Sequence, residues 1–454
     1  MIRFDRITVT DKTVFEKYIT GKHIRNCDMA FANIYCWQDT YRSEIAECDG
    51  FLLVRFRYGG GETGYMQPVG SGSVRNIVSA LADDAAARDS ALRIVGMTPE
   101  WKSEIEKTFP DLFAFSSPRS LCDYIYLSSD LATLQGRRYQ PKRNHVNRFT
   151  SQYAYRYEPL SETNMPDCME LNRKWQELRN DGSSSEQAEQ AAMQRAFAHF
   201  DELGLRGWVL YADDRIAAFT YGSAIDGETF CTHVEKVDTE IDGAGAMINR
   251  LFAQSLADEY RYINREEDLG LEGLRFSKLS YHPTILLEKI SARMLTTRER
   301  QIRTLWEEVF GDERAFVDTF LMHHHDPELC LTREADGRIV AMLHIVPMNT
   351  DLGRMAYIYA VATAAEYRHR GYASSLLDEA LAKTETSGEY DFAALIPSGD
   401  ESKRLYAAHG FEDVGIPITF NHEFDFGTGD ASKDSAMIYP IHDKALPERI
   451  TVLP

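Results

Sequence analysis

A short segment between a predicted strand and a predicted helix contains the residue types that bind phosphate groups. Residues 357–377 have the sequence YIYAVATAAEYRHRGYASSLL, an apolar strand followed by the turn RHRGYA and an amphipathic helix. The first amide groups of a helix have no partner inside the helix, and the helix dipole favours an anion in front of them. Arg368 and Arg370 add positive charge at the same place. The segment therefore predicts a site for a phosphate or pyrophosphate.

The following strand and helix contain a tyrosine whose place in the order of elements is informative. Residues 391–396 (DFAALI) predict a short buried strand, and residues 401–411 (ESKRLYAAHGF) predict a helix ending at Gly410. The R-x-x-G-x-A turn, the strand, the L-Y helix and the G-F pair together resemble the acetyl-CoA-binding signature of the GNAT acyltransferases. The resemblance implies that Tyr406 lies near the cofactor sulfur and protonates the departing thiolate, because a phenol keeps its proton at neutral pH. Gly410 is expected to end its helix in the left-handed conformation.

The same resemblance implies how an acyl-CoA, most simply acetyl-CoA, is bound as cosubstrate. The strand at residues 357–363 is expected to separate from its neighbour and to offer N–H groups near Val361 and Thr363. One of them would polarise the thioester carbonyl. The pyrophosphate would lie against Arg368, His369, Arg370, Gly371, Tyr372, Ala373 and Ser374. No general base is indicated by spacing, and Glu366, Tyr359, His344 and a chain of water molecules remain open alternatives.

A run of three histidines, His323-His324-His325, suggests a metal at first sight. Consecutive residues of a helix point in different directions, so a regular helix cannot direct all three at one ion. We interpret the run as the end of a helix and predict no metal site.

The chain is acidic and has the composition of a globular protein. It contains 454 residues, of which 50 are basic and 70 acidic, with a formal net charge of −20. This charge argues against nonspecific binding to nucleic acid, and we expect no DNA partner. The seven cysteines are scattered without a C-x-x-C pair, which is typical of reduced thiols. No apolar segment has the length of a signal peptide core or membrane helix, so we expect a cytoplasmic protein without membrane insertion.

Basic residues are concentrated in residues 136–149 (GRRYQPKRNHVNRF) of this acidic chain. Such density is typical of a solvated helix face. An α/β pattern follows, with strands expected at residues 207–211, 216–221 and 230–236 and a glycine turn at 240–249 (EIDGAGAMIN). The turn has small residues where a backbone approaches a neighbour or ligand. It lacks a counterpart of Arg368.

The basic run, the IDGA segment and residues 262–283 (YINREEDLGLEGLRFSKLSYHP) carry a second resemblance. Over residues 1–293 they look like a bacterial family related to the C-terminal catalytic domain of phosphatidylglycerol lysyltransferases. The resemblance implies two tandem GNAT-like folds with an acceptor groove in the second. The candidate substrate residues are Lys142, Arg143, Asn144, Arg275 and Lys278.

The predicted fold class is α/β (α+β), with three tandem GNAT-like folds, each a mixed sheet flanked by helices. We place a fold without a cofactor loop in residues 1–128 and a lysyltransferase-like fold in residues 129–295. A GNAT acetyltransferase domain is expected in residues 296–423, opened by a helix whose capping pattern starts at Thr297. Residues 424–454 are expected to form a C-terminal arm.

The expected activity is that of an acyltransferase, a GNAT N-acetyltransferase that moves an acyl group from CoA to an amine of a small molecule or peptide. Two alternatives depend on residues 1–293. One is aminoacyl transfer from a charged tRNA, which is less favoured, and the other is a noncatalytic module that binds substrate. The missing arginine before residues 241–246 favours a role without CoA for that part of the chain.

Overall fold

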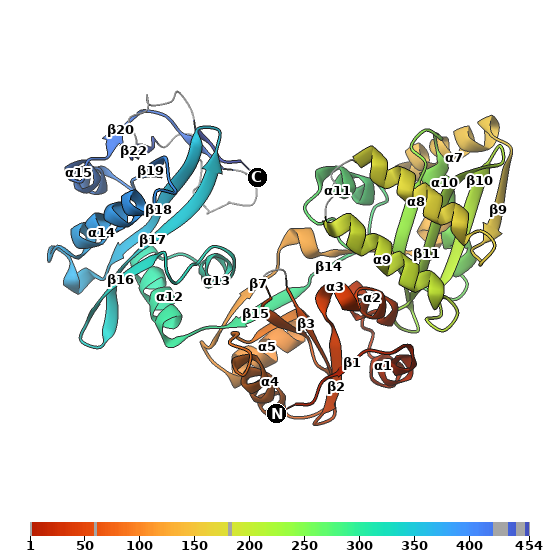
Figure 1. The fold of residues 1–454 in the computed structure, drawn as a ribbon, viewed down its shortest axis with the longest axis horizontal. Helices are drawn as coiled ribbons and strands as arrows, with labels where there is room; N and C mark the ends of the chain where they lie inside the picture. Colours follow the sequence, from red (N-terminus) through yellow and green to blue (C-terminus); the bar gives the residue numbers. More distant parts are fainter. Residues whose placement is uncertain (1, 59–60, 180–183, 421–434, 442–449, 454) are drawn as a thin grey trace. The chain divides into compact units, whose positions relative to one another are not determined.

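The computed structural model describes residues 2–58, 61–179, 184–420, 435–441 and 450–453. They divide into two compact units (Figure 1), an N-terminal unit of Met1–Phe109 with Ser117–Ala292 and a C-terminal unit of Pro110–Ser116 with Arg293–Pro454. Both contain mixed sheets flanked by helices, so the predicted α/β fold class is confirmed. The predicted division at residues 128, 295 and 423 stays a prediction.

The first sheet of the N-terminal unit has the strand order β1-β2-β3-β4-β6-β15, with β5 paired to β3. Its strands are β1 (Asp5–Arg6), β2 (Glu44–Cys48), β3 (Phe51–Arg57), β4 (Thr63–Met66), β5 (Val69–Gly70), β6 (Arg93–Met97) and β15 (Ile290–Met294). The helices around it are α1 (Lys12–Ile19), α2 (Phe31–Cys36), α3 (Gln38–Tyr41), α4 (Val74–Ala86) and α5 (Pro99–Thr108), with 3-10 turns at Val9–Asp11 and Cys27–Met29. β3 is buried on both faces, which explains its unbroken apolar run.

The second sheet of this unit has the order β14-β8-β13-β12-β11-β10-β9. Its strands are β8 (Asp123–Leu127), β9 (Tyr155–Pro159), β10 (Arg206–Ala212), β11 (Arg215–Ala224), β12 (Thr229–Val237), β13 (Tyr262–Asn264) and β14 (Ile285–Leu287). Its helices are α6 (Ser128–Thr133), α7 (Gln140–Gln152), α8 (Met165–Arg179), α9 (Ser184–Ala198), α10 (Ala244–Leu256) and α11 (Glu272–Leu279), with 3-10 turns at Arg119–Leu121 and Arg137–Tyr139. In Figure 1, α8 and α9 cross one face of this sheet while α7 and α10 cover the other.

The two sheets of the N-terminal unit are not built from one continuous segment each. β8, which ends at Leu127, pairs with β13 and β14 of the second sheet, and β15 returns to the first sheet after the second is complete. Such exchanges depend on pairing between distant residues, which local sequence patterns do not reveal.

The main sheet of the C-terminal unit has the order β16-β17-β18-β19-β22-β20. The strands of this unit are β7 (Phe113–Ser116), β16 (Cys330–Ala335), β17 (Arg338–Thr350), β18 (Gly353–Thr363), β19 (Phe392–Leu395), β20 (Glu412–Asp413), β21 (Ile418–Thr419), β22 (Met437–Pro440) and β23 (Ile450–Thr451). Its helices are α12 (Thr297–Phe310), α13 (Arg314–His323), α14 (Tyr372–Ser387) and α15 (Asp400–Ala408), with a 3-10 turn at Ala365–Tyr367. The sequence assigned residues 424–454 to an arm, whereas β22 lies inside the sheet between β19 and β20.

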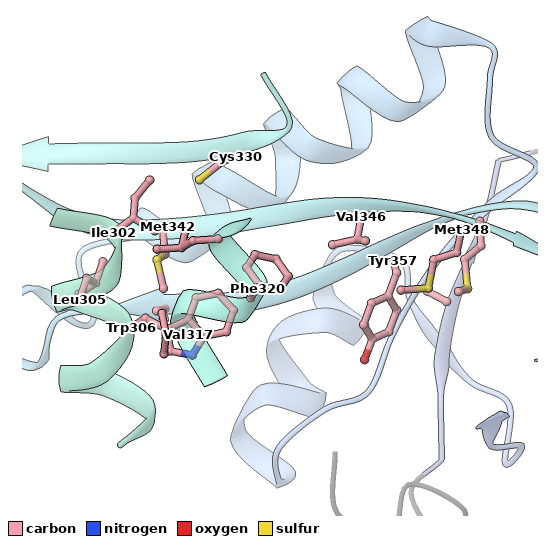
Figure 2. Close-up of a cluster of buried hydrophobic side chains, with 14 of the residues drawn as sticks. Ile302, Leu305, Trp306, Val317, Phe320, Cys330, Met342, Val346, Met348 and Tyr357 are labelled. Carbon is pink, nitrogen blue, oxygen red and sulfur yellow. The ribbon is translucent and has the colours of Figure 1, made fainter. Parts of the chain in front are cut away.

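The core of the C-terminal unit lies between α12, α13 and the long strands β17 and β18. Figure 2 shows Trp306 of α12 and Phe320 of α13 packed beside Met342 of β17. The N-terminal cap of α12 is Thr296, one residue before the predicted cap at Thr297, because Thr296 Oγ1 accepts the amide of Glu299 at 3.1 Å and Glu299 Oε2 accepts the amide of Thr296 at 2.8 Å. This reciprocal pair is a capping box and satisfies two amide groups at the start of the helix.

Candidate active site

The strand before the arginine turn is interrupted by a β-bulge. The register of β17 against β18 shifts between Met342, opposite Ala362, and His344, opposite Tyr359. Two residues of β18, Ala360 and Val361, therefore stand where β17 has a single one. Ala360 takes a left-handed φ of 49°, which is uncommon for a residue with a side chain. The bulge thus lies at the predicted contact residue Val361 and turns its backbone out of the regular ladder.

β18 also separates from its parallel neighbour. Its pairs with β19 run from Met355–Phe392 to Tyr357–Ala394, although β18 continues to Thr363. This is the separation that the family resemblance implied for residues 357–363. The hydroxyl Oγ1 of Thr363 is buried and has no hydrogen-bond partner among the described residues. A buried hydroxyl without a partner is costly, so this end of β18 is suited to a polar ligand.

The turn after β18 presents the start of α14. His369 and Gly371 both have positive φ, 60° and 81°, and Gly371 is the N-terminal cap of the helix. The first bond of the helix runs from the amide of Ser375 to the carbonyl of Gly371 at 3.0 Å. The amides of the residues between them point out of the helix end. A Cβ built on Gly371 would have no heavy atom of the described residues within 4 Å, so this part of the structure leaves space open at the turn.

The two arginines of the turn are exposed and help to shape it. Arg368 Nε donates to the carbonyl of Thr363 at 3.3 Å, and Arg370 Nη2 donates to the carbonyl of Glu366 at 3.0 Å. The carboxylate of Glu366 pairs with Arg338. The turn therefore keeps two positive charges at the surface near the helix end, while the Glu366 considered as a base is held in an ion pair.

Tyr406 lies on α15, the helix that follows β19. It is buried, and its ring centre is 6.0 Å from that of Phe411. Burial raises the pKa of Tyr406 to about 12, so the phenol remains protonated well above neutral pH. Gly410 has a φ of 87°, and its predicted left-handed conformation is confirmed.

The histidine and the tyrosine considered as bases, His344 and Tyr359, pack against the core of the C-terminal unit. His344 is 2% exposed, and its Nε2 lies 3.3 Å from Nδ1 of His325. Burial lowers the pKa of His325 to about 4 and that of His344 well below the usual value, so both rings are neutral near pH 7. The ring of Tyr359 packs 5.6 Å from that of Trp306. These contacts show that the side chains of His344 and Tyr359 contribute to packing.

The run of three histidines diverges as its spacing predicts. His323 Nε2 lies 2.9 Å from Ser116 Oγ, whereas His325 faces His344. Within the described residues, three groups bring enough nitrogen, sulfur and oxygen atoms together to hold a metal ion. They are His325 with Cys330 and His344, Cys231 with His233 and Glu266, and Cys27 with Asp123 and Glu267. The expected absence of a metal therefore stays a prediction.

The glycine turn of the N-terminal unit has the same backbone form but is covered. Gly243 caps α10 with a φ of 83°, close to the value at Gly371. A Cβ built on Gly243 would lie 2.4 Å from the carbonyl oxygen of His145 on α7. Arg148, also on α7, pairs with Asp242 of the turn. α7 thus occupies the space where the C-terminal turn is open.

The predicted substrate residues of the N-terminal unit are engaged in different places. Arg143 Nη1 donates to the carbonyl of Gly136 at 2.7 Å. Arg275 binds the carboxylate of Asp268 through two hydrogen bonds of 2.8 and 3.1 Å. Lys278 Nζ donates to the carbonyl of Arg265 at 2.7 Å. Asn144 is exposed on α7. Lys142 Nζ lies 4.0 Å from the ring centre of Tyr281, and burial lowers the pKa of Lys142 to about 8.

Three residues of the N-terminal unit that sequence reasoning did not select lie where β12 and β13 separate. The parallel pairing of these strands ends at Cys231 opposite Asn264, as the pairing of β18 with β19 ends at Tyr357. His233 occupies a bulge of β12, because the register against β11 shifts between Tyr221 and Gly222. Glu266 follows β13 and approaches His233. Only the C-x-H spacing at residues 231–233 hinted at this group.

The separated, bulged strand and the open helix start define the C-terminal unit as an acyltransferase of the GNAT class. Residues 292–414 match the family model described as acetyltransferase (GNAT) domain. Residues 22–293, more than half of the chain, match the model described as phosphatidylglycerol lysyltransferase, C-terminal. The chain therefore belongs to the family of phosphatidylglycerol lysyltransferase C-terminal domains and carries a GNAT domain behind that part.

Known structures and sequences show how far the likeness extends. A conserved protein of unknown function from Bacteroides thetaiotaomicron is 41% identical, with a TM-score of 0.63 over 65% of this chain and 100% of that one. The L-PGS structure from Bacillus licheniformis is 14% identical, with a TM-score of 0.44 over 63% of this chain and 92% of that one. An uncharacterized protein of Mycoplasmoides gallisepticum is 25% identical over 183 residues, 39% of this chain, and the chain spans 57% of that curated relative's length.

None of the helices in the described part of the chain is both long and apolar enough to cross a membrane.

Proposed function

We propose that the C-terminal unit transfers an acyl group, most simply acetyl, from CoA to the amine of a small molecule or peptide. The observation that carries this proposal is the open turn at Gly371, which follows a bulged strand that has left its parallel neighbour. Helix amides and two exposed arginines belong to this turn, and among the described residues no heavy atom lies within 4 Å of a Cβ built on Gly371. The pyrophosphate of CoA has the charge and size that such a helix start binds.

The proposed reaction proceeds by direct attack. The amine nitrogen forms a bond to the thioester carbonyl carbon, the carbon–sulfur bond breaks, and the amine loses one proton. A backbone N–H at the bulge near Val361 would stabilise the negative charge that develops on the carbonyl oxygen, an effect of about 3 kcal/mol in other enzymes. Tyr406 would give its phenolic proton to the thiolate, and its raised pKa keeps that proton available. The residue that takes the amine proton is unassigned.

The acceptor and the role of the N-terminal unit belong to the same proposal. We propose a cytoplasmic enzyme whose N-terminal unit contributes a site without CoA. Transfer from an aminoacyl-tRNA is less favoured, because the basic run is engaged within the chain. Arg138 pairs with Asp130 at 2.8 Å. Arg143 donates to the backbone carbonyl of Gly136, and Arg148 pairs with Asp242. These bonds leave fewer free cations for phosphates of RNA.

The proposal is tested by calorimetric titration of CoA and acetyl-CoA into the full chain and into Gly371→Glu. The added carboxylate would stand where the pyrophosphate binds, and we expect Kd to rise roughly 100-fold, about 2.7 kcal/mol. Gly388→Glu is the matched control, since Gly388 ends the same helix α14 with a φ of 65° and no described heavy atom lies within 4 Å of a Cβ there. It should bind CoA like the parent.

Two results would contradict the proposal. One is the absence of CoA binding by the parent chain, and the other is equal binding by Gly371→Glu and Gly388→Glu. The second result would place any bound CoA away from the N-terminus of α14.

A further inference from the structure

Three groups of cysteine, histidine and acidic side chains come together in the described part of the chain, and two of them have an explanation inside the protein. In the first, the ammonium of Lys289 lies 2.9 Å from Asp123, 3.3 Å from Glu267 and 3.6 Å from Cys27 Sγ. The lysine already supplies a cation to that group. A second cation there would be repelled by a charge that is itself buried.

The second group lies in the core of the C-terminal unit and contains no carboxylate. A divalent ion bound by the thiolate of Cys330 and two neutral imidazoles would leave a buried positive charge, which is costly. His344 Nδ1 is buried without a partner among the described residues. Histidines that bind metals almost always donate their other ring N–H to an oxygen. This group therefore fits a packed histidine pair better than a metal centre.

The third group, Cys231, His233 and Glu266, has the spacing of metal ligands. Glu266 Oε1 lies 3.2 Å from His233 Nδ1 and 3.6 Å from Cys231 Sγ. Ligands at about 2.0–2.3 Å from a tetrahedral zinc ion are separated by about 3.3 Å for nitrogen and oxygen and about 3.5 Å for sulfur and oxygen. Both distances from Glu266 are therefore close to those expected around one ion, and all three donor atoms lie within 4.8 Å of one another.

The outer contacts of these residues hold them in the orientation that a metal requires. The second ring nitrogen of His233, Nε2, lies 2.8 Å from Ser223 Oγ, which leaves Nδ1 directed at the group. Asn33 Nδ2 donates to Glu266 Oε1 at 2.8 Å. Partners of this kind fix the tautomer of a ligand histidine and the position of a ligand carboxylate. Glu266 is held there at a φ of 58°, an uncommon backbone conformation outside glycine.

Charge and access also fit a catalytic type of site. One thiolate and one carboxylate balance a divalent cation, so a bound ion adds no net charge to the interior. Cys231 is fully buried, whereas the side chain of Glu266 is 27% exposed, so the group opens on the side of the glutamate. Three protein ligands with one open position are the pattern of catalytic zinc sites.

We propose that Cys231, His233 and Glu266 bind one divalent cation of zinc-like preference, with a fourth position open to an oxygen ligand such as water or an acyl carbonyl. Binding must expel the proton of the Cys231 thiol, whose bond to hydrogen is replaced by one to the metal. The site is independent of the CoA site in the C-terminal unit.

The test uses the full chain, stripped with a chelator and titrated with Zn²⁺ or Co²⁺ alone. We expect one ion per chain and, with Co²⁺, a thiolate charge-transfer band in the near ultraviolet. Cys231→Ser should abolish that band, and Ser223→Ala should weaken binding about 10–100-fold by releasing His233. Cys330→Ser and Cys27→Ser are matched controls, because each removes the sulfur of one of the other two groups. Both should retain the band.

Other outcomes would overturn the proposal. These are the absence of stoichiometric binding, a thiolate band that survives Cys231→Ser, or a band that is lost in Cys330→Ser or Cys27→Ser instead. Thermal unfolding of each variant followed by circular dichroism shows whether it is folded. If Cys231→Ser does not fold, His233→Ala serves as the second test and should likewise lose the ion. CoA titration is read separately, so failure at one site is distinguishable from failure at the other.

Discussion

Two glycine turns with nearly the same backbone, Gly371 and Gly243, have opposite surroundings. Both cap a helix that follows a bulged strand, and their φ values are 81° and 83°. At Gly371 a Cβ would meet no atom of the described chain within 4 Å, whereas at Gly243 it would meet the carbonyl of His145 at 2.4 Å. A helix start can bind an anion only where its amides are accessible. The turn conformation alone therefore does not define a phosphate site.

The element that makes the difference is α7, the helix formed by most of the basic run. Its His145 covers Gly243, and its Arg148 pairs with Asp242 beside the same turn. The C-terminal turn instead carries Arg368 and Arg370 in its own sequence. At the Gly243 turn the positive charge comes from Arg148 of the packed helix α7 and is paired with Asp242. At the Gly371 turn the charges of Arg368 and Arg370 belong to the turn itself and stay at the surface.

The largest expected effect concerns the chemistry beside the open turn. Tyr406→Phe should lower kcat by about 10²–10⁴-fold, because it removes the general acid, while leaving the Kd for CoA unchanged. Since the pKa of Tyr406 is raised to about 12, the acid form persists as pH rises, and activity should not fall on the alkaline side until that region. Steady-state rates across pH, beside calorimetry, check both points. An unaltered kcat in the phenylalanine variant would remove Tyr406 from the mechanism.

A smaller effect compares the two turns directly through stability. Gly371→Ala places a side chain at positive φ in open space and should cost about 1–2 kcal/mol. Gly243→Ala has the same backbone strain, and its methyl group also collides with the carbonyl oxygen of His145, so α7 must move. We therefore expect a loss of about 2–4 kcal/mol in the free energy of unfolding. Urea unfolding of the two variants gives both values. Equal losses would mean that α7 does not pack closely on Gly243.

Arg275 provides a pH-dependent prediction for the N-terminal unit. Burial acts to raise the pKa of Asp268, but hydrogen bonds from Arg275 and Tyr124 outweigh it and lower the pKa to about 2. Because this folded-state pKa is below the ordinary value of about 3.9, the stabilisation is present above pH 4 and is lost as pH falls through about 2. Arg275→Ala should cost about 1–3 kcal/mol near neutral pH and less near pH 3.

Urea unfolding at both pH values measures this difference, and Arg261→Ala, an exposed arginine stacked on Tyr262, is a control. The control should show little change with pH. A loss in Arg275→Ala that does not depend on pH would point to packing instead of the charge of Asp268.

The smallest expected effect tests whether the ion pair or the helix backbone closes the N-terminal turn. Arg148→Ala removes an exposed pair with Asp242 and should change the free energy of unfolding by less than about 1 kcal/mol. It should create no second CoA site, because the carbonyl of His145 still covers Gly243. Calorimetry of this variant combined with Gly371→Glu checks the point. CoA binding in that double variant would show that Arg148 alone closes the turn.

Local patterns predicted much of the C-terminal unit because its signals lie close together in sequence. The strand, the turn at residues 368–371 and α14 are consecutive, and the left-handed conformation of Gly410 follows from its place after a helix. The separation of β18 from β19 followed from the family resemblance. The bulge at Ala360 had no local signal, since it depends on the register against β17.

Features built from distant residues escaped prediction for the same reason. The cover over Gly243 joins residues 145 and 243, and the group of Cys231, His233 and Glu266 joins the strand β12 and the loop after β13. The basic run looked like a site because its charges are dense in sequence, yet several of them bind carbonyls and carboxylates of the same chain. Whether a charge is free or paired is decided by tertiary contacts.

The position of β22 has a consequence for the order in which the chain acquires structure during synthesis. β19 pairs with β22, which lies about forty residues further along, so the buried apolar strand Phe392–Leu395 has an open edge until Met437–Pro440 emerge from the ribosome. Open apolar edges recruit strands from other molecules. Nascent chains that stall before residue 437 should therefore be prone to aggregate, and chaperone demand should be concentrated in that interval of translation.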